Sequence, residues 1–228
     1  MKTESDPAKP GVRVLPSRAG RPRAIGGGRL AFTLIEMLVV FGLIAALAGL
    51  IIGAASAGFN KRIRSRVQTE RDALVNAIEY YKQVKGFYPP DNVSNNTNDP
   101  VMNSLFYELT GTITIGSPTP VAFSSVLLQD QLAQNTIQAT FNVGGFVNAA
   151  LTNSEIKNFY KTLKPGQYTT LASGVTLLVV PYKGPTPPPT PNTWRYNSSK
   201  PTHNPDSFDL WADVIIGSKT NTIGNWRD

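Results

Sequence analysis

The chain has 228 residues, among them no cysteine and a single histidine, His203. The absence of cysteine excludes disulfides, thiolate metal sites and cysteine nucleophiles. One histidine is too few for a histidine-rich metal centre. The sequence also lacks a glycine-rich phosphate loop, a motif for a serine, histidine and aspartate triad, and a pair of carboxylates in a catalytic context. We therefore predict that the protein is not an enzyme.

The net positive charge of the chain is small outside its N-terminal segment. The formal net charge is +7, and residues 1–31, with seven basic and two acidic side chains, carry +5 of it. The rest of the chain is nearly neutral, which argues against nucleic-acid binding, so no nucleic-acid partner is expected. Residues 1–31 are rich in proline, glycine and arginine and show no apolar periodicity, which predicts a disordered basic leader.

Proline is missing between Pro22 and Pro89. A helix that begins at Phe32 can therefore continue to about Lys85 without interruption. The 23 residues from Met37 to Phe59 contain no charged side chain and no histidine. A run of this length is sufficient to cross a bilayer as a helix.

Glu36 is the only charged residue between Ala31 and Phe59. A carboxylate within a membrane helix costs about 2.5–3.5 kcal/mol, so a partner is expected for it. One interpretation of this segment is an uncleaved signal anchor. Another is a secretory signal peptide with Ala46 and Ala48 before its cleavage site, although the apolar run continues beyond them. Basic residues flank the segment on both sides, so charge alone does not orient it.

A third interpretation comes from residues 31–36, AFTLIE. This sequence resembles the processing site of type IV prepilins and of the pseudopilins of type II secretion systems. The resemblance implies that prepilin peptidase cuts between Ala31 and Phe32 and methylates the new amino group of Phe32. Ala31 stands where glycine is usual, and Glu36 becomes the fifth residue of the mature chain. The resemblance also places the leader in the cytoplasm and the C-terminal domain in the periplasm.

The charges expected after cleavage agree with this resemblance. Cleavage would create an ammonium group at Phe32, and Glu36 lies one helical turn later, at i+4. In a filament, the amine of one subunit and the carboxylate of a neighbour would offset part of each other's desolvation cost. The resemblance therefore assigns Glu36 a role in assembly.

The part of the predicted helix beyond residue 59 is amphipathic. Five apolar residues follow a helical spacing and should face a globular domain: Ile63, Val67, Leu74, Ile78 and Tyr81. Gly86 and the pair Pro89-Pro90 are expected to end the helix. The sequence GFYP at residues 86–89 resembles the end of the long helix in pseudopilins, and it favours the major pseudopilin of type II secretion.

Short segments follow in the C-terminal domain. Asp99-Pro100 should begin a short helix that ends at Gly111. We expect residues 123–134 to be helical, residues 136–147 to form a strand or loop, and residues 153–163 to form another helix. We interpret residues 112–165 as an insertion that decorates the core.

The last third of the chain shows strand patterns. The expected strands and connections are a buried strand at 175–180, a proline-rich spacer at 184–191, two half-buried strands at 193–196 and 207–211, and a last edge at 215–226. The sequence around FDLW resembles the C-terminal sheet of secretion pseudopilins, and the resemblance implies a calcium ion in the following loop, residues 212–221. Asp209 and Asp213 are its candidate ligands, because calcium prefers carboxylate oxygens. Asp213 as a simple turn or cap residue is the alternative.

Taken together, these patterns predict an α+β, pilin-like fold in which a long N-terminal helix packs on a small C-terminal antiparallel sheet with extra helices. The expected domain organisation is a removed leader at 1–31, a transmembrane and polymerisation half-helix at 32–59, an amphipathic half-helix at 60–88 and a periplasmic domain at 89–228. No cofactor is predicted, and calcium at Asp209 and Asp213 is the one candidate ion.

The expected function is that of a pseudopilin subunit, inserted in the bacterial inner membrane and then assembled into a periplasmic pseudopilus. Its expected partners are further copies of itself, minor pseudopilins, prepilin peptidase, the membrane, and an inner-membrane assembly platform with a cytoplasmic ATPase. One alternative is a type IV pilus or competence pilin that binds surfaces or DNA. A membrane-anchored enzyme with unrecognised chemistry is a further alternative.

Overall fold

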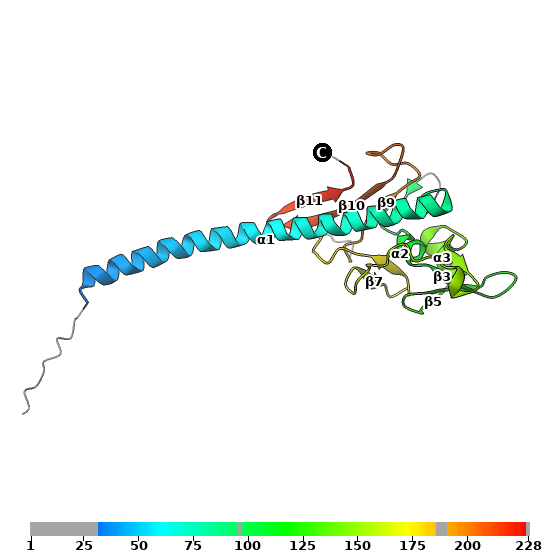
Figure 1. Cartoon of the computed structure of the whole chain (residues 1–228), viewed down its shortest axis with the longest axis horizontal. Helices are drawn as coiled ribbons and strands as arrows, with labels where there is room; N and C mark the ends of the chain where they lie inside the picture. The colour runs from blue at the N-terminus through cyan, green and yellow to red at the C-terminus, as the bar shows by residue number, and fades with distance from the viewer. Residues whose placement is uncertain (1–31, 95–96, 186–190, 227–228) are drawn as a thin grey trace, which may run out of the picture. The chain divides into compact units, whose positions relative to one another are not determined.

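The computed structural model describes residues 32–94, 97–185 and 191–226. The leader with Ala31, and residues 186–190 of the proline-rich spacer, lie outside the described residues. The chain divides into two compact units, one that ends at Gly49 and one that begins at Leu50. The described part is a mixed α+β structure with an apolar N-terminal helix and small, mainly antiparallel sheets, which confirms the predicted fold class at this level (Figure 1).

Helix α1 runs from Leu34 to Lys85, as the absence of proline predicted. Within the first unit, every described side chain of the helix is exposed. Within the second unit, the predicted apolar stripe is buried, with exposed fractions from 0 to 6% at Ile63, Val67, Leu74, Ile78 and Tyr81. The amphipathic part of α1 is therefore a component of the core of this unit.

Gly86 ends helix α1, as expected. Its φ of +87° lies in the left-handed region, which favours glycine, and its N–H donates to the Lys82 carbonyl at 2.8 Å. The next helix, α2, runs from Leu105 to Thr110, so it begins later than predicted. Asp99 caps only a turn, in which its Oδ1 accepts the N–H groups of the two residues after Pro100.

The strands of the second unit form four small sheets in the described part of the chain. The N-terminal pair is β1 (Val93–Ser94) with β2 (Thr97–Asn98), and a second pair is β7 (Tyr168–Thr170) with β8 (Thr176–Leu178). The largest has the order β5 (Gln131–Ala133), β4 (Ala122–Ser125), β3 (Thr112–Ile115), β6 (Ala149–Ala150). The C-terminal sheet has the order β11 (Lys219–Gly224), β10 (Asp209–Ile216), β9 (Arg195–Asn197).

The C-terminal sheet lies along the second half of helix α1 (Figure 1). Alternate residues of β10, Leu210, Ala212 and Val214, are fully buried, as a half-buried strand requires. Two arginines of α1 fasten the outer strand β11: Arg64 donates to the Asn221 side chain at 2.6 Å, and Arg71 donates to the Gly224 carbonyl at 2.7 Å. The expected strands at 175–180, 193–196 and 207–211 are confirmed by β8, β9 and β10.

Three expectations within residues 112–165 are wrong. Residues 123–134, expected to be helical, contain strands β4 and β5, which pair with Phe123 opposite Leu132. Residues 136–147 were expected to be a strand or loop, but residues 136–141 belong to helix α3 (Gln134–Phe141) and only residues 142–147 form a loop. The helix expected at 153–163 is a single 3-10 turn, Asn153–Glu155. The reason is tertiary packing, since the short apolar patterns of this region become strand or helix according to what covers them.

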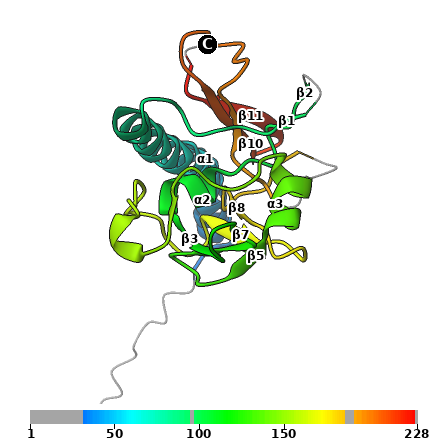
Figure 2. The ribbon, with the colours of Figure 1, turned by 90° about the vertical axis from the view of Figure 1, so that its right-hand side faces the viewer.

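Residues 112–165 also contribute to the core of the second unit. Phe146 stacks on Tyr107 of α2 with ring centroids 4.5 Å apart, and Phe123 and Phe141 pack edge-on against Phe146. Figure 2 shows α2 close to α1, β8 and the β3 sheet in the same unit. These aromatic contacts join the segment to α2, beyond the surface position that was expected of it.

A buried carboxylate connects α1, α2 and this segment. Glu108 of α2 is 1% exposed and accepts the Tyr81 hydroxyl at 2.8 Å, the Val147 N–H at 2.8 Å and the Asn148 N–H at 3.0 Å. Burial raises the pKa of Glu108, and the three donors oppose that rise. The carboxylate is thus an internal link between three parts of the chain.

Candidate processing and assembly site

The N-terminus of helix α1 is closed by reciprocal hydrogen bonds between Thr33 and Glu36. The Glu36 N–H donates to Thr33 Oγ1 at 3.2 Å, while Glu36 Oε2 accepts the Thr33 N–H and the Thr33 hydroxyl, both at 2.8 Å. This is a capping box, in which a threonine before the helix and a glutamate three residues later satisfy each other's backbone donors. The helix therefore begins at Leu34.

The sequence contained a signal for this contact that our prediction missed. The pattern Thr-x-x-Glu before an apolar run is the signature of a capping box, and it gives Glu36 a function without any second subunit. Among the described residues, however, no donor reaches the other oxygen, Oε1. The carboxylate can therefore cap its own helix through Oε2 and accept a further cation through Oε1.

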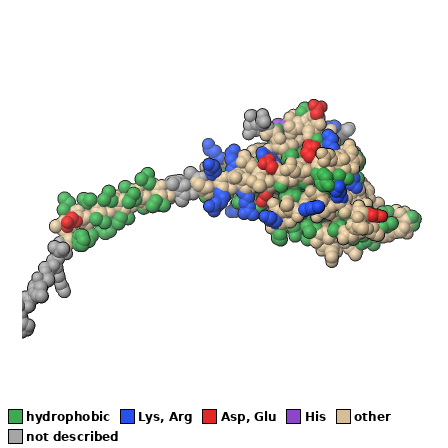
Figure 3. Space-filling model, viewed as in Figure 1, with side chains coloured by type: hydrophobic (Ala, Val, Ile, Leu, Met, Phe, Trp, Pro, Cys, Tyr) green, Lys and Arg blue, Asp and Glu red, His purple; other side chains and the backbone are tan. Residues whose placement is uncertain are grey.

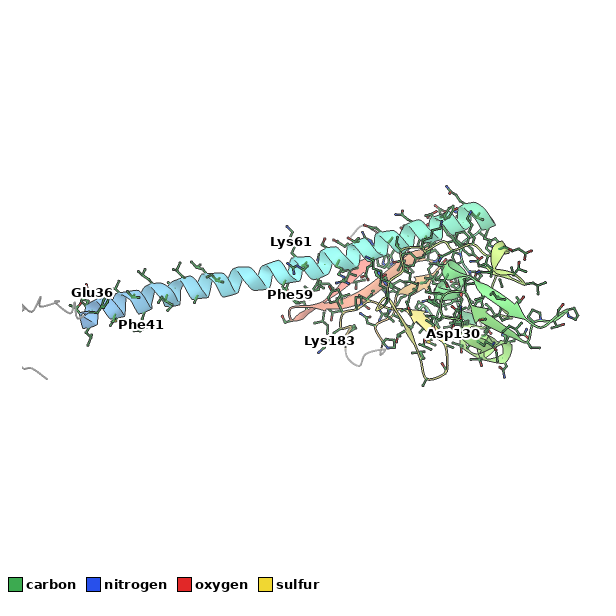
Figure 4. All side chains as sticks on the ribbon, turned by 60° about the horizontal axis from the view of Figure 1, so that its bottom comes forward. Glu36, Phe41, Phe59, Lys61, Asp130 and Lys183 are labelled. Atoms are coloured by element: carbon green, nitrogen blue, oxygen red, sulfur yellow. The ribbon has the colours of Figure 1, made fainter. Side chains whose placement is uncertain are left out.

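Phe32 lies just outside the helix and is 70% exposed. It adjoins Thr33, so a new amino group at Phe32 would be close to the Glu36 carboxylate along the chain. Ala31, the residue expected before the cleavage site, lies outside the described residues. The structure therefore places two of the three predicted residues, Phe32 and Glu36, at the start of the helix, where Figure 4 labels Glu36.

The helix that follows Glu36 is apolar on all its faces. Leu34–Ile51 is long and apolar enough to cross a membrane, and none of this window is buried within the protein. Its large exposed side chains dominate the surface of the first unit (Figure 3), and they include Leu38, Phe41, Leu43, Ile44 and Leu47. An apolar surface of this extent requires a membrane or a partner to cover it.

The candidate calcium site does not fit the arrangement of its residues. The loop expected at 212–221 is instead a hairpin in which β10 continues to Ile216 and Gly217-Ser218 form the turn before β11. Both oxygens of Asp209 are occupied, since they accept the N–H groups of Thr202, His203 and Asn204 at 2.7–3.0 Å. Desolvation of Asp209 opposes these donors, but the donors prevail and lower its pKa.

Asp213 lies in the middle of β10, so neither the metal role nor the turn or cap role predicted for it applies. Its Oδ2 lies 3.2 Å from Nη1 of Arg195 in β9, and its Oδ1 accepts the Thr222 hydroxyl at 2.6 Å. Asp213 therefore forms cross-strand contacts that stabilise the sheet. No group of three or more histidine, aspartate and glutamate side chains comes together within the described part of the chain.

Comparisons of the chain with protein-family models, with curated proteins and with solved structures found no match.

Proposed function

We propose that the protein is a structural pseudopilin that prepilin peptidase processes between Ala31 and Phe32 and that assembles into the periplasmic pseudopilus of a type II secretion system. The observation that carries the proposal is the position of Glu36, a carboxylate with one oxygen that no donor among the described residues reaches, at the start of an uncovered apolar helix. The sequence AFTLIE, which ends at Glu36, resembles the processing site of prepilins and pseudopilins, as described above.

The architecture of the second unit supports the proposal. A long helix whose second half packs on a C-terminal antiparallel sheet is the pilin-like arrangement that the resemblance implies. In this proposal the apolar half of the helix first anchors the subunit in the inner membrane, with the C-terminal domain in the periplasm. In the filament, neighbouring copies then cover the same surface.

The two oxygens of Glu36 have separate roles in the proposed assembly. Oε2 caps the helix of its own chain, and Oε1 accepts the methylated amine of Phe32 in a neighbouring copy. Pairing of two charges in an apolar filament core offsets part of the desolvation cost of each. Minor pseudopilins, an assembly platform and its cytoplasmic ATPase are the partners that this process requires.

The first test is mass spectrometry of the N-terminus of the mature protein, produced in a bacterium that has a prepilin peptidase. We expect a chain that begins at N-methylated Phe32. A chain that begins at Met1 would reject processing and favour an uncleaved anchor. A start at Gly49 would identify a secretory signal peptide instead.

The second test separates the two roles of Glu36. Glu36→Gln keeps a capping side chain at this helix position but removes the charge, so processing should continue while filament assembly falls by roughly tenfold, the equivalent of about 1.4 kcal/mol. Thr33→Val removes the hydroxyl half of the cap, at a cost of about 1 kcal/mol, but keeps the carboxylate. Assembly of this control should remain near normal. The opposite ranking of the two variants would reject the pairing and leave Glu36 as a capping residue.

A further inference from the structure

Six basic side chains gather at one end of the second unit. We name this group the basic collar; four members lie on α1, one on the loop after β8 and one at the start of β11: Lys61, Arg62, Arg64, Arg66, Lys183 and Lys219. All six are exposed. The concentration of basic side chains on α1 beside the globular part is visible in Figure 3.

Contacts within the unit bring these three segments together. The hydrogen bond from Arg64 to Asn221 fixes α1 against β11, just after Lys219. The Ile215 N–H donates to the Lys183 carbonyl at 2.8 Å, so the loop with Lys183 lies against β10. Figure 4 places Lys61 and Lys183 at the same end, near the β10–β11 turn.

Acidic side chains neutralise little of this charge. Nε of Arg66 lies 3.6 Å from Oε1 of Glu70, its i+4 partner. Asp213 of β10 forms its ion pair with Arg195 and not with a member of the collar. Among the described residues, Lys61, Arg62 and Lys219 form no ion pair. The collar is therefore a surface with a strong excess of positive charge, on a unit whose other charged side chains sum to a formal net charge of −3.

The collar also follows the membrane segment directly along the chain. The uncharged run ends at Phe59, whose ring is 61% exposed, and Lys61 comes two residues later. When residues 37–59 span a bilayer, Lys61 and Arg62 reach the level of the lipid phosphates. Each lysine or arginine near an anionic membrane surface contributes about 1 kcal/mol of attraction.

We propose that the basic collar binds the headgroups of anionic phospholipids and holds the second unit against the membrane surface before assembly. Arginine can bind a phosphate through two parallel hydrogen bonds, and lysine adds a point charge. This inference goes beyond the proposed function, because it requires only that the apolar helix lies in a bilayer. It depends neither on processing nor on filament formation.

The test uses the full chain, whose lack of cysteine allows one label at Ser218→Cys, in the exposed β10–β11 turn. The labelled protein is reconstituted in vesicles of phosphatidylcholine, with or without phosphatidylglycerol, that contain a headgroup-attached quencher. We expect quenching to increase about twofold or more with phosphatidylglycerol and to decrease at high salt, because salt screens exposed charges.

A triple variant, Lys61→Gln with Arg62→Gln and Lys219→Gln, should lose most of this increase, since each cation is worth about fivefold in the docking equilibrium. The matched control replaces three lysines outside the collar. Lys85 lies in the last turn of α1, and Lys157 and Lys161 follow the 3-10 turn Asn153–Glu155. The control should retain the increase. Circular dichroism in detergent checks that both triple variants are folded.

Several results would overturn the inference. Quenching that does not change with phosphatidylglycerol, or that falls equally in both triple variants, would reject the binding of lipid headgroups by the collar. Disulfide-linked dimers through Ser218→Cys, without any lipid dependence, would assign the collar to contacts between copies. Collar-dependent binding of duplex DNA on pure phosphatidylcholine vesicles, again without a lipid effect, would assign it to nucleic acid. A mature chain that begins at Met1 would reject the pseudopilin proposal but leave this inference intact.

Discussion

Two stretches of helix α1 differ completely in what covers them. From Leu34 to Ile51 every side chain is exposed, whereas the stripe from Ile63 to Tyr81 is buried in the core of the second unit. Both stretches are continuous helix with abundant apolar residues. The difference is that the second has a polar face and a protein surface to cover its stripe, while the first is apolar all round and has neither.

This comparison indicates where each stretch obtains its stabilisation. Burial of apolar surface removes it from water, at roughly 25 cal/mol per Å². The second stretch obtains this stabilisation within its own chain, so the C-terminal domain should be sensitive to its residues. Under the proposed function the first obtains it from lipid or from other copies, so its residues should affect insertion and assembly but leave the folding of the domain unchanged.

The largest expected effect comes from the matched pair Leu74→Ala and Leu47→Ala. Leu74 is 1% exposed and its truncation leaves a core cavity, so the free energy of unfolding should fall by about 2–5 kcal/mol. Leu47 is 59% exposed, and its truncation should change this quantity by less than about 0.5 kcal/mol. Chemical unfolding in detergent can be followed by the fluorescence of Trp194, which is buried in the same unit.

Equal destabilisation by the two variants would break the comparison, because it would mean that the apolar stretch is packed against the C-terminal domain in solution. A Leu74→Ala variant as stable as the wild type would also break the comparison, because it would mean that the stripe is not packed in the core. The difference between the two substitutions is therefore more informative than either value alone.

The sequence predicted the features of this helix well, because its signals are local and repeated. A long interval without proline, a helical stripe over five positions and a glycine at the end each have a direct physical meaning. The strands at β8, β9 and β10 were also predicted, from apolar runs and alternation. Thr33 was available as a capping signal but was not used, so the second role of Glu36 was missed.

The segment 112–165 and the candidate calcium site could not be predicted in the same way. Ile137 and Phe141 lie at helical spacing in α3, but the segment is short, and aromatic side chains from distant parts of the chain complete its packing. Asp213 becomes a sheet residue because β10 continues through it and pairs it with Thr222 of β11, and its carboxylate then meets Arg195 of β9. Such long-range pairings leave no local pattern in a single sequence.

A smaller effect should come from the carboxylate that binds the second stretch to α2. Glu108→Gln places an amide donor against the N–H and O–H groups that the carboxylate accepts, and should lower the free energy of unfolding by about 1–3 kcal/mol. Tyr81→Phe removes one donor and leaves the two backbone donors, so its cost should be lower, about 1 kcal/mol. If neither variant is destabilised, the link between α1 and α2 has no energetic weight.

The smallest effect concerns Glu70, which lies on α1 between Val67 and Leu74 of the buried stripe. It is 7% exposed, its Oε2 has no hydrogen-bond partner among the described residues, and burial raises its pKa although Gln167 and Arg66 oppose the rise. Because the raised pKa favours the protonated form in the folded state, the stability that this group contributes is present at low pH and is lost as the pH rises through the folded-state value. Glu70→Gln should therefore match the wild type in acid and exceed it by about 0.5 kcal/mol at neutral pH.

The exposed Glu155 offers a matched control, since Glu155→Gln should change the free energy of unfolding at neutral pH by clearly less than Glu70→Gln does. A wild-type protein that gains stability relative to Glu70→Gln as the pH rises would show that the ionised carboxylate is satisfied, through Arg66 or a partner. In that case, contacts in the second unit would stabilise an ionised carboxylate beside the buried stripe. The two stretches of α1 would then differ in their charged contacts as well as in their burial.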